Sequence, residues 1–215
     1  MTRDTAGPVK TRSEKARETR LRMLEAAKQL FGQSGYASTK IEAIAREAGV
    51  AVQTIYFTFG NKRAILKELL DLAVAGDAEP IPTLERPWVR EALTAAPDEQ
   101  LRIQVAASRE IYGRVAPVLE IVRGAAAADP EVAELWRINR DQRHTVQAHL
   151  VTALAAKGAL RETLTLTRAI DIAYSLLSPE IYQLLVFERG WPAQEWEAFT
   201  LRALICELLE PGTGK

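Results

Sequence analysis

Residues 35–62 read GYASTKIEAIAREAGVAVQTIYFTFGNK, and this stretch decides the fold. Apolar residues recur at helical spacing over 40–47 and again over 52–57, with Gly49 between the two segments. Glycine ends a helix at little cost because it lacks a Cβ atom. Two short helices joined by a tight turn form the helix-turn-helix pattern, whose second helix lies in the DNA major groove. The stretch therefore predicts a DNA-reading module.

Longer helices are expected on both sides of this module. Apolar residues at helical spacing predict a helix over 13–33, which Gly35 would end. After Gly60, Asn61 is expected to cap a further helix over 62–76. Thr39 and Glu42 have the spacing of a capping box, in which the hydroxyl bonds an amide three residues on.

The second short helix carries the side chains suited to DNA. Short polar and aromatic residues face outward from it, and such side chains bond phosphates and base edges. Two lysines flank the module near helix N-termini, where backbone amides also favour phosphate. The candidate DNA-binding residues are Thr39, Lys40, Val52, Gln53, Thr54, Tyr56, Phe57, Thr58 and Lys62.

The order of residues across this region resembles the DNA-binding domain of the tetracycline-repressor (TetR) family. The matching residues are Gly35-Tyr36, Thr39, Ile44-Ala45, Ala48-Gly49-Val50, Thr54-Ile55-Tyr56, Phe59-Gly60-Asn61-Lys62 and Leu66. The resemblance implies that Thr39, Thr54, Tyr56 and Lys62 contact phosphates. It places Val52, Gln53 and Phe57 nearest the bases. It also implies an all-α fold, with an N-terminal three-helix DNA-binding domain and a C-terminal helical domain for ligand binding and dimerisation.

Three positions depart from the family pattern. Ala51 stands where Ser or Thr often caps the recognition helix, and losing such a cap costs about 1 kcal/mol. Gln53 stands where Gly is frequent, and a glutamine there could read adenine through two hydrogen bonds. Thr58 replaces a frequent His or Tyr. These departures bear on the operator sequence rather than on DNA binding itself.

Composition agrees with a two-part chain. The net charge is zero, yet residues 1–70 hold 13 Lys and Arg against 7 Asp and Glu, so the basic part comes first. Residues 1–12 are basic and almost without apolar side chains, which predicts a disordered arm. A single cysteine, no secretory signal and no apolar run long enough to span a bilayer indicate a cytoplasmic protein.

The remaining chain is expected to be helical. A proline-rich connector over 76–98, with one short helix near Trp88–Leu93, leads to helices near 98–114, 116–128, 131–157, 165–177, 180–189 and 192–209. Asp129-Pro130 and Ser178-Pro179 each combine an N-cap with proline at the first helical position. The expected domains are a basic arm (1–12), a helix-turn-helix domain (13–60), a connecting helix (61–76) and a C-terminal domain (77–215).

Polar side chains interrupt two apolar stripes of the C-terminal domain. Buried polar groups need partners, which are other side chains, water or a ligand. One interpretation is a mixed aromatic and polar pocket for a hydrophobic or aromatic effector, and the other is a structural network, for example Arg143 paired with a glutamate. The candidate pocket residues are Ser108, Tyr112, Trp136, Asn139, Arg143 and Tyr174.

Two late helices have wide apolar coverage. A terminal helix that is apolar on two faces is buried both in its own subunit and in a partner. The resemblance implies that these helices pair across a two-fold axis into a four-helix bundle. The candidate dimer residues are Leu166, Ile170, Leu201, Leu204, Ile205 and Leu208.

These observations together predict a homodimeric transcriptional regulator that binds a palindromic operator as a repressor and is released by a small effector. The helix over 62–76 would transmit the effector signal to the DNA-binding domain. Neither a metal site nor a cofactor is expected, because His144 and His149 are five residues apart and no phosphate-binding glycine loop precedes a helix. A small helical enzyme and a protein-only adaptor are the alternatives. The adaptor would bind without a steep salt dependence.

Overall fold

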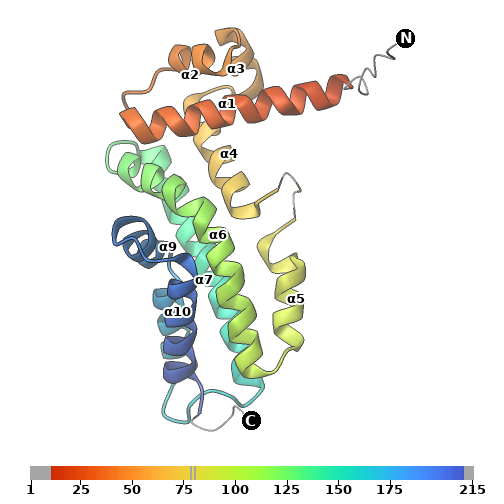
Figure 1. Cartoon of the computed structure of the whole chain (residues 1–215), viewed down its shortest axis with the longest axis vertical. Helices are drawn as coiled ribbons and strands as arrows, with labels where there is room; N and C mark the ends of the chain where they lie inside the picture. The colour runs from red at the N-terminus through yellow and green to blue at the C-terminus, as the bar shows by residue number, and fades with distance from the viewer. Residues whose placement is uncertain (1–10, 78, 80, 211–215) are drawn as a thin grey trace, which may run out of the picture. The chain divides into compact units, whose positions relative to one another are not determined.

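The computed structural model describes residues 11–77, 79 and 81–210, and most of the expected basic arm lies outside these residues. The chain divides into two compact units, one up to Leu69 and one from Leu70 on. The division falls within the helix that was expected to connect the domains. Across the described ranges the fold is helical, and its one β-bridge is an isolated pairing of Leu160 with Leu209 (Figure 1).

Helix α1 (Arg12–Ser34) begins slightly earlier than predicted, because Thr11 and Glu14 form a capping box. The Glu14 amide donates to the Thr11 hydroxyl at 3.2 Å, and the Thr11 amide donates to the Glu14 carboxylate at 2.7 Å. These bonds satisfy two of the amides that a helix start leaves unpaired. The last two residues of the expected arm, Thr11 and Arg12, therefore belong to the start of α1.

The helix-turn-helix is confirmed as α2 (Ile41–Ala48) and α3 (Val52–Phe59), with Gly49 in the left-handed conformation between them (φ 65°). Ile44 and Ile55 are fully buried and anchor the two short helices to their neighbours. Helix α4 (Lys62–Ala75) follows, and the Asn61 side chain accepts a hydrogen bond from the Ala64 amide at 2.8 Å, as predicted.

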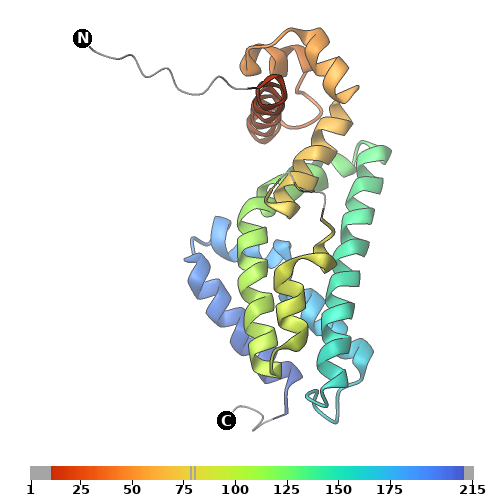
Figure 2. The same ribbon diagram turned by 90° about the vertical axis from the view of Figure 1, so that its right-hand side faces the viewer.

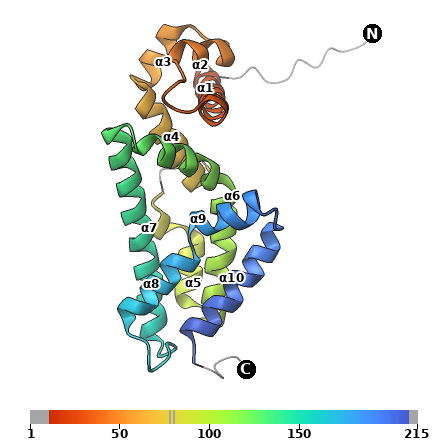
Figure 3. The same ribbon diagram turned by 90° about the vertical axis from the view of Figure 1, so that its left-hand side faces the viewer.

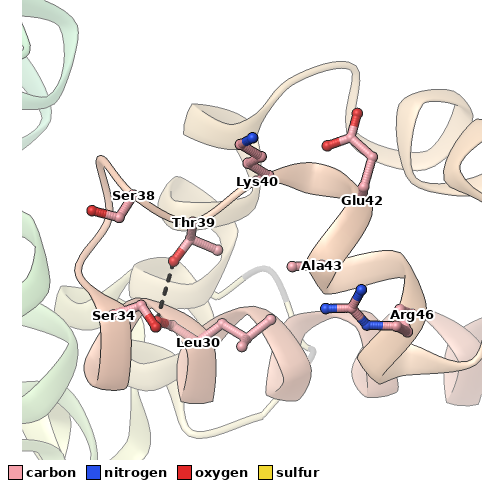
Figure 4. Close-up of a pocket in the computed structure, with 8 residues that line it drawn as sticks. All are labelled: Leu30, Ser34, Ser38, Thr39, Lys40, Glu42, Ala43 and Arg46. Carbon is pink, nitrogen blue, oxygen red and sulfur yellow. Dashed lines mark hydrogen bonds between the residues drawn. The ribbon is translucent and has the colours of Figure 1, made fainter.

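The predicted capping box at the start of α2 is wrong. Lys40 occupies the N-cap position, and no side chain caps this helix. The Thr39 hydroxyl instead donates to the carbonyl oxygens of Gly35 at 2.8 Å and Leu30 at 3.1 Å. Thr39 therefore secures the turn after α1, since its side chain points toward that helix (Figure 4).

The second unit packs its helices around one core. Its elements are the 3₁₀ helix η1 (Thr83–Glu85), α5 (Pro87–Thr94), α6 (Pro97–Ala126), α7 (Pro130–Ala156), α8 (Leu166–Leu176), α9 (Pro179–Tyr182), the π-helical turn η2 (Gln183–Glu188) and α10 (Ala193–Leu208). Figure 2 shows the short α5 lying against α6 and α7. Figure 3 shows α8 and α10 side by side on another face of α6 and α7. Side chains from these helices fill the core, among them Leu101, Val105, Val122, Leu150, Leu154, Ala169, Trp196 and Leu204.

Helix α6 corrects the prediction of two helices over 98–114 and 116–128. It is one helix with Pro117 inside it. Proline removes one backbone donor and crowds the preceding turn, which kinks a helix without always ending it. The second half of α6 changes direction in Figure 3. Buried residues on both sides of the proline, such as Tyr112 and Val122, keep the two halves in the same core.

The predicted helix starts after α6 are confirmed. The Asp129 carboxylate accepts hydrogen bonds from the amides of Glu131 and Val132 at the start of α7. The Ser178 hydroxyl accepts one from the Ile181 amide at the start of α9. Among the described helices, none combines the length and the apolar character that a membrane span requires.

Candidate DNA-binding surface and effector-binding residues

Helix α3 buries one side and leaves the other in solvent. Ile55 and Phe59 are buried on the inner side. On the outer side Phe57 is 94% exposed, Tyr56 is 49% exposed, and Gln53 is also exposed. Gln53 and Phe57 are four residues apart, so they lie on the same face of the helix. A glutamine amide and two aromatic rings thus form an outward surface that no described part of the chain covers.

Both short helices begin without a side-chain cap. Lys40 at the start of α2 and Ala51 at the start of α3 make no capping bond. The first amides of a helix have no intrahelical acceptor and carry the positive end of the helix dipole. Such amides bind phosphate oxygens well. The predicted lack of a cap at Ala51 is confirmed, and it leaves these donors available to DNA.

A hollow of about 250 Å³ lies beside the start of α2. Figure 4 shows Lys40, Glu42 and Arg46 projecting from α2 around it. Lys40 and Arg46 are both exposed, so two cations flank one carboxylate. Arg46, in the last turn of α2, was not among the predicted DNA-binding residues.

Lys62, a predicted phosphate contact, is bonded within the module. Its ammonium donates to the carbonyl oxygens of Tyr36 at 2.7 Å, Thr39 at 3.0 Å and Ala37 at 3.3 Å. It also lies 4.4 Å from the centre of the Tyr36 ring. An ammonium has three N–H donors, and all three are used here. Lys62 therefore clamps the turn between α1 and α2 to the start of α4.

Two threonines are also engaged inside the module. Thr39 is only 4% exposed and donates to the two carbonyl oxygens named above, so its hydroxyl proton is not available to a phosphate. The Thr58 hydroxyl donates to the Thr54 carbonyl at 2.7 Å, which leaves its oxygen only as an acceptor. A phosphate offers no donor to such an oxygen. Thr54 and Val52 are partly exposed beside Gln53, and their DNA contacts remain predictions.

Ser108 and Tyr112, two of the predicted pocket residues, lie in a structural network. The Tyr112 hydroxyl donates to the Leu177 carbonyl at 2.6 Å, and its ring lies 5.9 Å from that of Trp196. The Ser108 hydroxyl donates to the Gln104 carbonyl at 2.8 Å. Burial raises the pKa of Tyr112 to about 12, so the phenol stays neutral at physiological pH. Tyr112 therefore ties α6 to the residue that follows α8, whereas the Ser108 hydroxyl is bonded within α6 itself.

Arg143 has the glutamate partner that the network interpretation named as an example. Its two terminal nitrogens donate to the Glu180 carboxylate at 2.9 and 3.0 Å. The guanidinium lies between Trp136 and Tyr174, at 5.8 and 5.6 Å from the ring centres. Burial is the largest single influence on Glu180 and raises its pKa. The hydrogen bonds and the charge of Arg143, with smaller contributions from a backbone hydrogen bond and the charge of Arg140, together outweigh burial, so the pKa lies below its ordinary value.

Asn139 is the predicted pocket residue that the network does not satisfy. It is 5% exposed, and its side-chain oxygen has no hydrogen-bond partner within the described part of the chain. The same holds for the Arg143 Nε atom and for the side-chain oxygen of Gln183. Ser108, Tyr112 and Arg143 thus have structural partners, while Asn139 and the Arg143 Nε keep unmet polar groups, and an effector role for the six residues remains a prediction.

The predicted dimer residues divide into two groups. Leu204 and Leu208 are fully buried within the subunit, so their prediction as interface residues is corrected. They continue the inner stripe of α10 that Trp196 and Thr200 begin, at a spacing of four residues. Leu166 is 41% exposed, and Ile170, Leu201 and Ile205 are partly exposed. Three large apolar side chains nearby in sequence are exposed and were not predicted: Leu184, Phe187 and Phe199.

Comparison with known proteins gives the same assignment as the geometry. Residues 23–69 match the family model for bacterial regulatory proteins of the tetR family. The HTH-type transcriptional regulator YdeS of Bacillus subtilis is 30% identical over 165 residues, which cover 76% of this chain and 77% of that protein.

Solved structures share the fold. The SmeT–triclosan complex matches with a TM-score of 0.72 at 17% identity, over 92% of this chain and 95% of that one. NalD, the secondary repressor of the MexAB-OprM multidrug efflux pump in Pseudomonas aeruginosa, matches with a TM-score of 0.68 at 20% identity, over 91% and 98%. The chain belongs to the TetR family of bacterial regulatory proteins and is a DNA-binding transcriptional regulator rather than an enzyme.

Proposed function

We propose that the chain is a repressor that binds a palindromic operator as a homodimer in the cytoplasm and is released by a small effector. The observation that carries the DNA-reading part is the solvent face of α3, where a 94% exposed Phe57 stands beside exposed Gln53 and Tyr56. Large apolar side chains are costly to leave in water, and an exposed group of them marks an interaction site. In a helix-turn-helix, this face of the second helix enters the major groove.

Each exposed group has a matching DNA partner. The Gln53 amide can pair with the two hydrogen-bonding groups of an adenine edge, and the Phe57 ring can pack on a thymine methyl group. Tyr56, Lys40 and the uncapped amides of α2 and α3 would contact phosphates. Thr39, Thr58 and Lys62 are left out of this contact set, because their donors are bonded within the module.

Dimerisation is supported by the exposed apolar side chains of the second unit. Leu166, Leu184 and Phe187 are each more than 40% exposed, and Phe199 is 36% exposed. A two-fold dimer would bury such a surface against its own copy. Two recognition helices related by that axis read two half-sites one or more helical turns apart.

Release by an effector is supported by the fold and by α4. The structurally similar SmeT is solved with triclosan, and NalD is a repressor. Helix α4 is uninterrupted from Lys62, which clamps the turn before α2, to Ala75 in the second unit. An effector that binds beside the end of α4 would shift the equilibrium between two positions of this helix.

The test is selection of operators from a random DNA library with the purified protein. We expect an inverted repeat bound by two protomers, with affinity that falls steeply as salt rises. No enriched sequence would refute the DNA-reading function. An enriched single site bound by a monomer would refute the homodimer.

A further inference from the structure

A groove of about 560 Å³ lies within the second unit, apart from the residues that the sequence suggested for a pocket. Its floor is one stripe of α6, in which Ile103, Ala107 and Ile111 follow one another at a spacing of four residues. The last turn of α4 and the start of α5, with Trp88, form its walls. Small side chains at the centre of the floor leave room, and the volume is that of a typical small-molecule site.

Three arginines and one glutamate are the charged residues that line this groove. Arg86 is bonded to the Asp77 carboxylate at 2.6 and 3.1 Å. Arg109 is bonded to Glu110, the glutamate of the groove, and to Glu197, both at 2.6 Å. Two of the three guanidinium groups are therefore already neutralised, and so is the one lining carboxylate.

Arg114 differs from the other two arginines. Its Nε donates to the Ala73 carbonyl at 3.2 Å, and it forms no ion pair within the described ranges. The guanidinium rests on the backbone of Gly76, where a Cβ atom would lie 2.7 Å from Nη2. Gly76 also has a positive φ of 77°, so a larger residue is disfavoured there. Arg114 is exposed, and the bond from its Nε leaves its terminal nitrogens with donors for an anion.

We propose that this groove binds an amphipathic organic anion, with its carboxylate on Arg114 and its apolar body on Trp88, Ile103 and Ile111. A guanidinium forms two parallel hydrogen bonds with a carboxylate, which a lone hydroxyl group cannot match. A cationic ligand finds no uncommitted carboxylate here, because Glu110 is bonded to Arg109. The inference deepens the proposed function, on which it rests, by naming the chemical class of the effector.

The groove also offers a route from ligand to regulation. Val74 and Ala75, in the last turn of α4, line it directly. A ligand that fills the groove touches the helix whose first residue, Lys62, clamps the turn before α2. Its binding would favour one position of α4 over another to the extent of its differential affinity for the two.

The test measures binding to the full-length protein without DNA by isothermal titration calorimetry. Three probes of equal chain length are compared below their micellar concentrations: decanoate, 1-decanol and decyltrimethylammonium. We expect decanoate to bind at least tenfold more tightly than the alcohol, and the cation to bind most weakly. Arg114→Gln should abolish the preference for decanoate over decanol. Arg123→Gln, on the same helix but paired with Glu120 outside the groove, should retain it.

A second variant tests the location. Ala107→Trp should fill the groove and abolish binding of all three probes, with unfolding midpoints recorded for every variant. Equal binding of decanoate and decanol by the wild type, tighter binding of the cation, or an unchanged preference in Arg114→Gln would overturn the proposal. Operator release is measured separately, so a protein that binds decanoate but no operator would refute the proposed function and leave this site standing.

Discussion

Helices α3 and α10 differ in where they place aromatic side chains: α10 buries its largest one, and α3 exposes Phe57. In α10 the largest side chain, Trp196, is fully buried, and its ring packs against Tyr112 and Tyr182. In α3 Phe57 is 94% exposed, although it could have been replaced by a polar residue without disturbing the core. An aromatic residue inside a core stabilises the fold, whereas neighbouring aromatic residues left in solvent, such as Tyr56 and Phe57, mark a surface for interaction. The buried Trp196 of α10 therefore serves folding, and the aromatic side chains on the outer face of α3 are available for recognition.

The largest expected effect concerns the buried side of this comparison. Trp196→Ala should lower the free energy of unfolding by about 3–5 kcal/mol, because it leaves a cavity among Tyr112, Tyr182 and α6. Urea unfolding followed by circular dichroism measures the change. Arg202→Ala, at an exposed position of the same helix, is the control and should cost less than about 1 kcal/mol. Equal losses for the two variants would mean that α10 is not oriented as described.

Two lysines of the DNA-binding unit show the same contrast, because Lys62 is bonded within the unit and Lys40 is exposed. Lys62→Met should destabilise this unit by about 2 kcal/mol, because three carbonyl oxygens lose a charged donor. Amide hydrogen exchange in α1 and α2 locates the loss.

Lys40→Gln should leave amide hydrogen exchange unchanged. It should instead reduce the slope of log operator affinity against log salt concentration by about one, the value of one phosphate contact. A reduced salt dependence in Lys62→Met, with normal exchange, would restore Lys62 as a phosphate contact.

The ion pair of Arg143 with Glu180 gives a pH dependence. The pKa of Glu180 lies below its ordinary value of 4.5, so the pair stabilises the folded state above that value and its contribution is lost as pH falls through the lowered pKa. Glu180→Gln should therefore be less stable than the wild type at pH 7, by about 1 kcal/mol for a partly exposed pair. The two unfolding curves should converge in acid. A constant difference down to pH 3 would assign the stabilisation to packing instead.

The smallest effect tests how Phe57 reads DNA. Replacing a contacted thymine by deoxyuridine removes only the 5-methyl group, which should weaken wild-type binding about fourfold, the value of one buried methyl group. Phe57→Ala should bind the two operators equally. Titration of both operators by fluorescence anisotropy measures the ratio. An unchanged thymine preference in Phe57→Ala would place the methyl contact elsewhere.

The DNA-binding unit was largely predictable from sequence, and the reason is physical. Gly49 and Gly60 end short helices through positive φ angles, and the apolar residues between them recur at helical spacing. The exposed face of α3 could be predicted because the helix is too short to bury both sides. The sequence could not show which acceptor each polar side chain bonds in the folded chain. Thr39 and Lys62 are polar residues for which the resemblance implies DNA contacts, yet in the structure they donate to carbonyl oxygens of the same unit.

The second unit was less predictable, because its polar residues lie where several helices meet. Spacing along α7 indicated that Arg143 needed a partner, but only the fold brings Glu180 to it from α9. Leu204 and Leu208 were assigned to the dimer surface because α10 is apolar on several sides, and periodicity alone does not distinguish the inner side from the outer. The lining of the Arg114 groove is spread from Val74 to Arg114 over three successive α-helices, so no local pattern indicated it.

The most direct test of the account is the operator affinity of Phe57→Ala, measured with the selected operator alongside Leu21→Ala as a control. Both side chains are exposed, but Leu21 lies on α1, outside the helix-turn-helix. We expect Phe57→Ala to keep the wild-type unfolding curve and to lose at least tenfold in affinity, about 1.4 kcal/mol, while Leu21→Ala binds normally. Wild-type affinity in a folded Phe57→Ala would contradict the claim that the exposed face of α3 reads DNA.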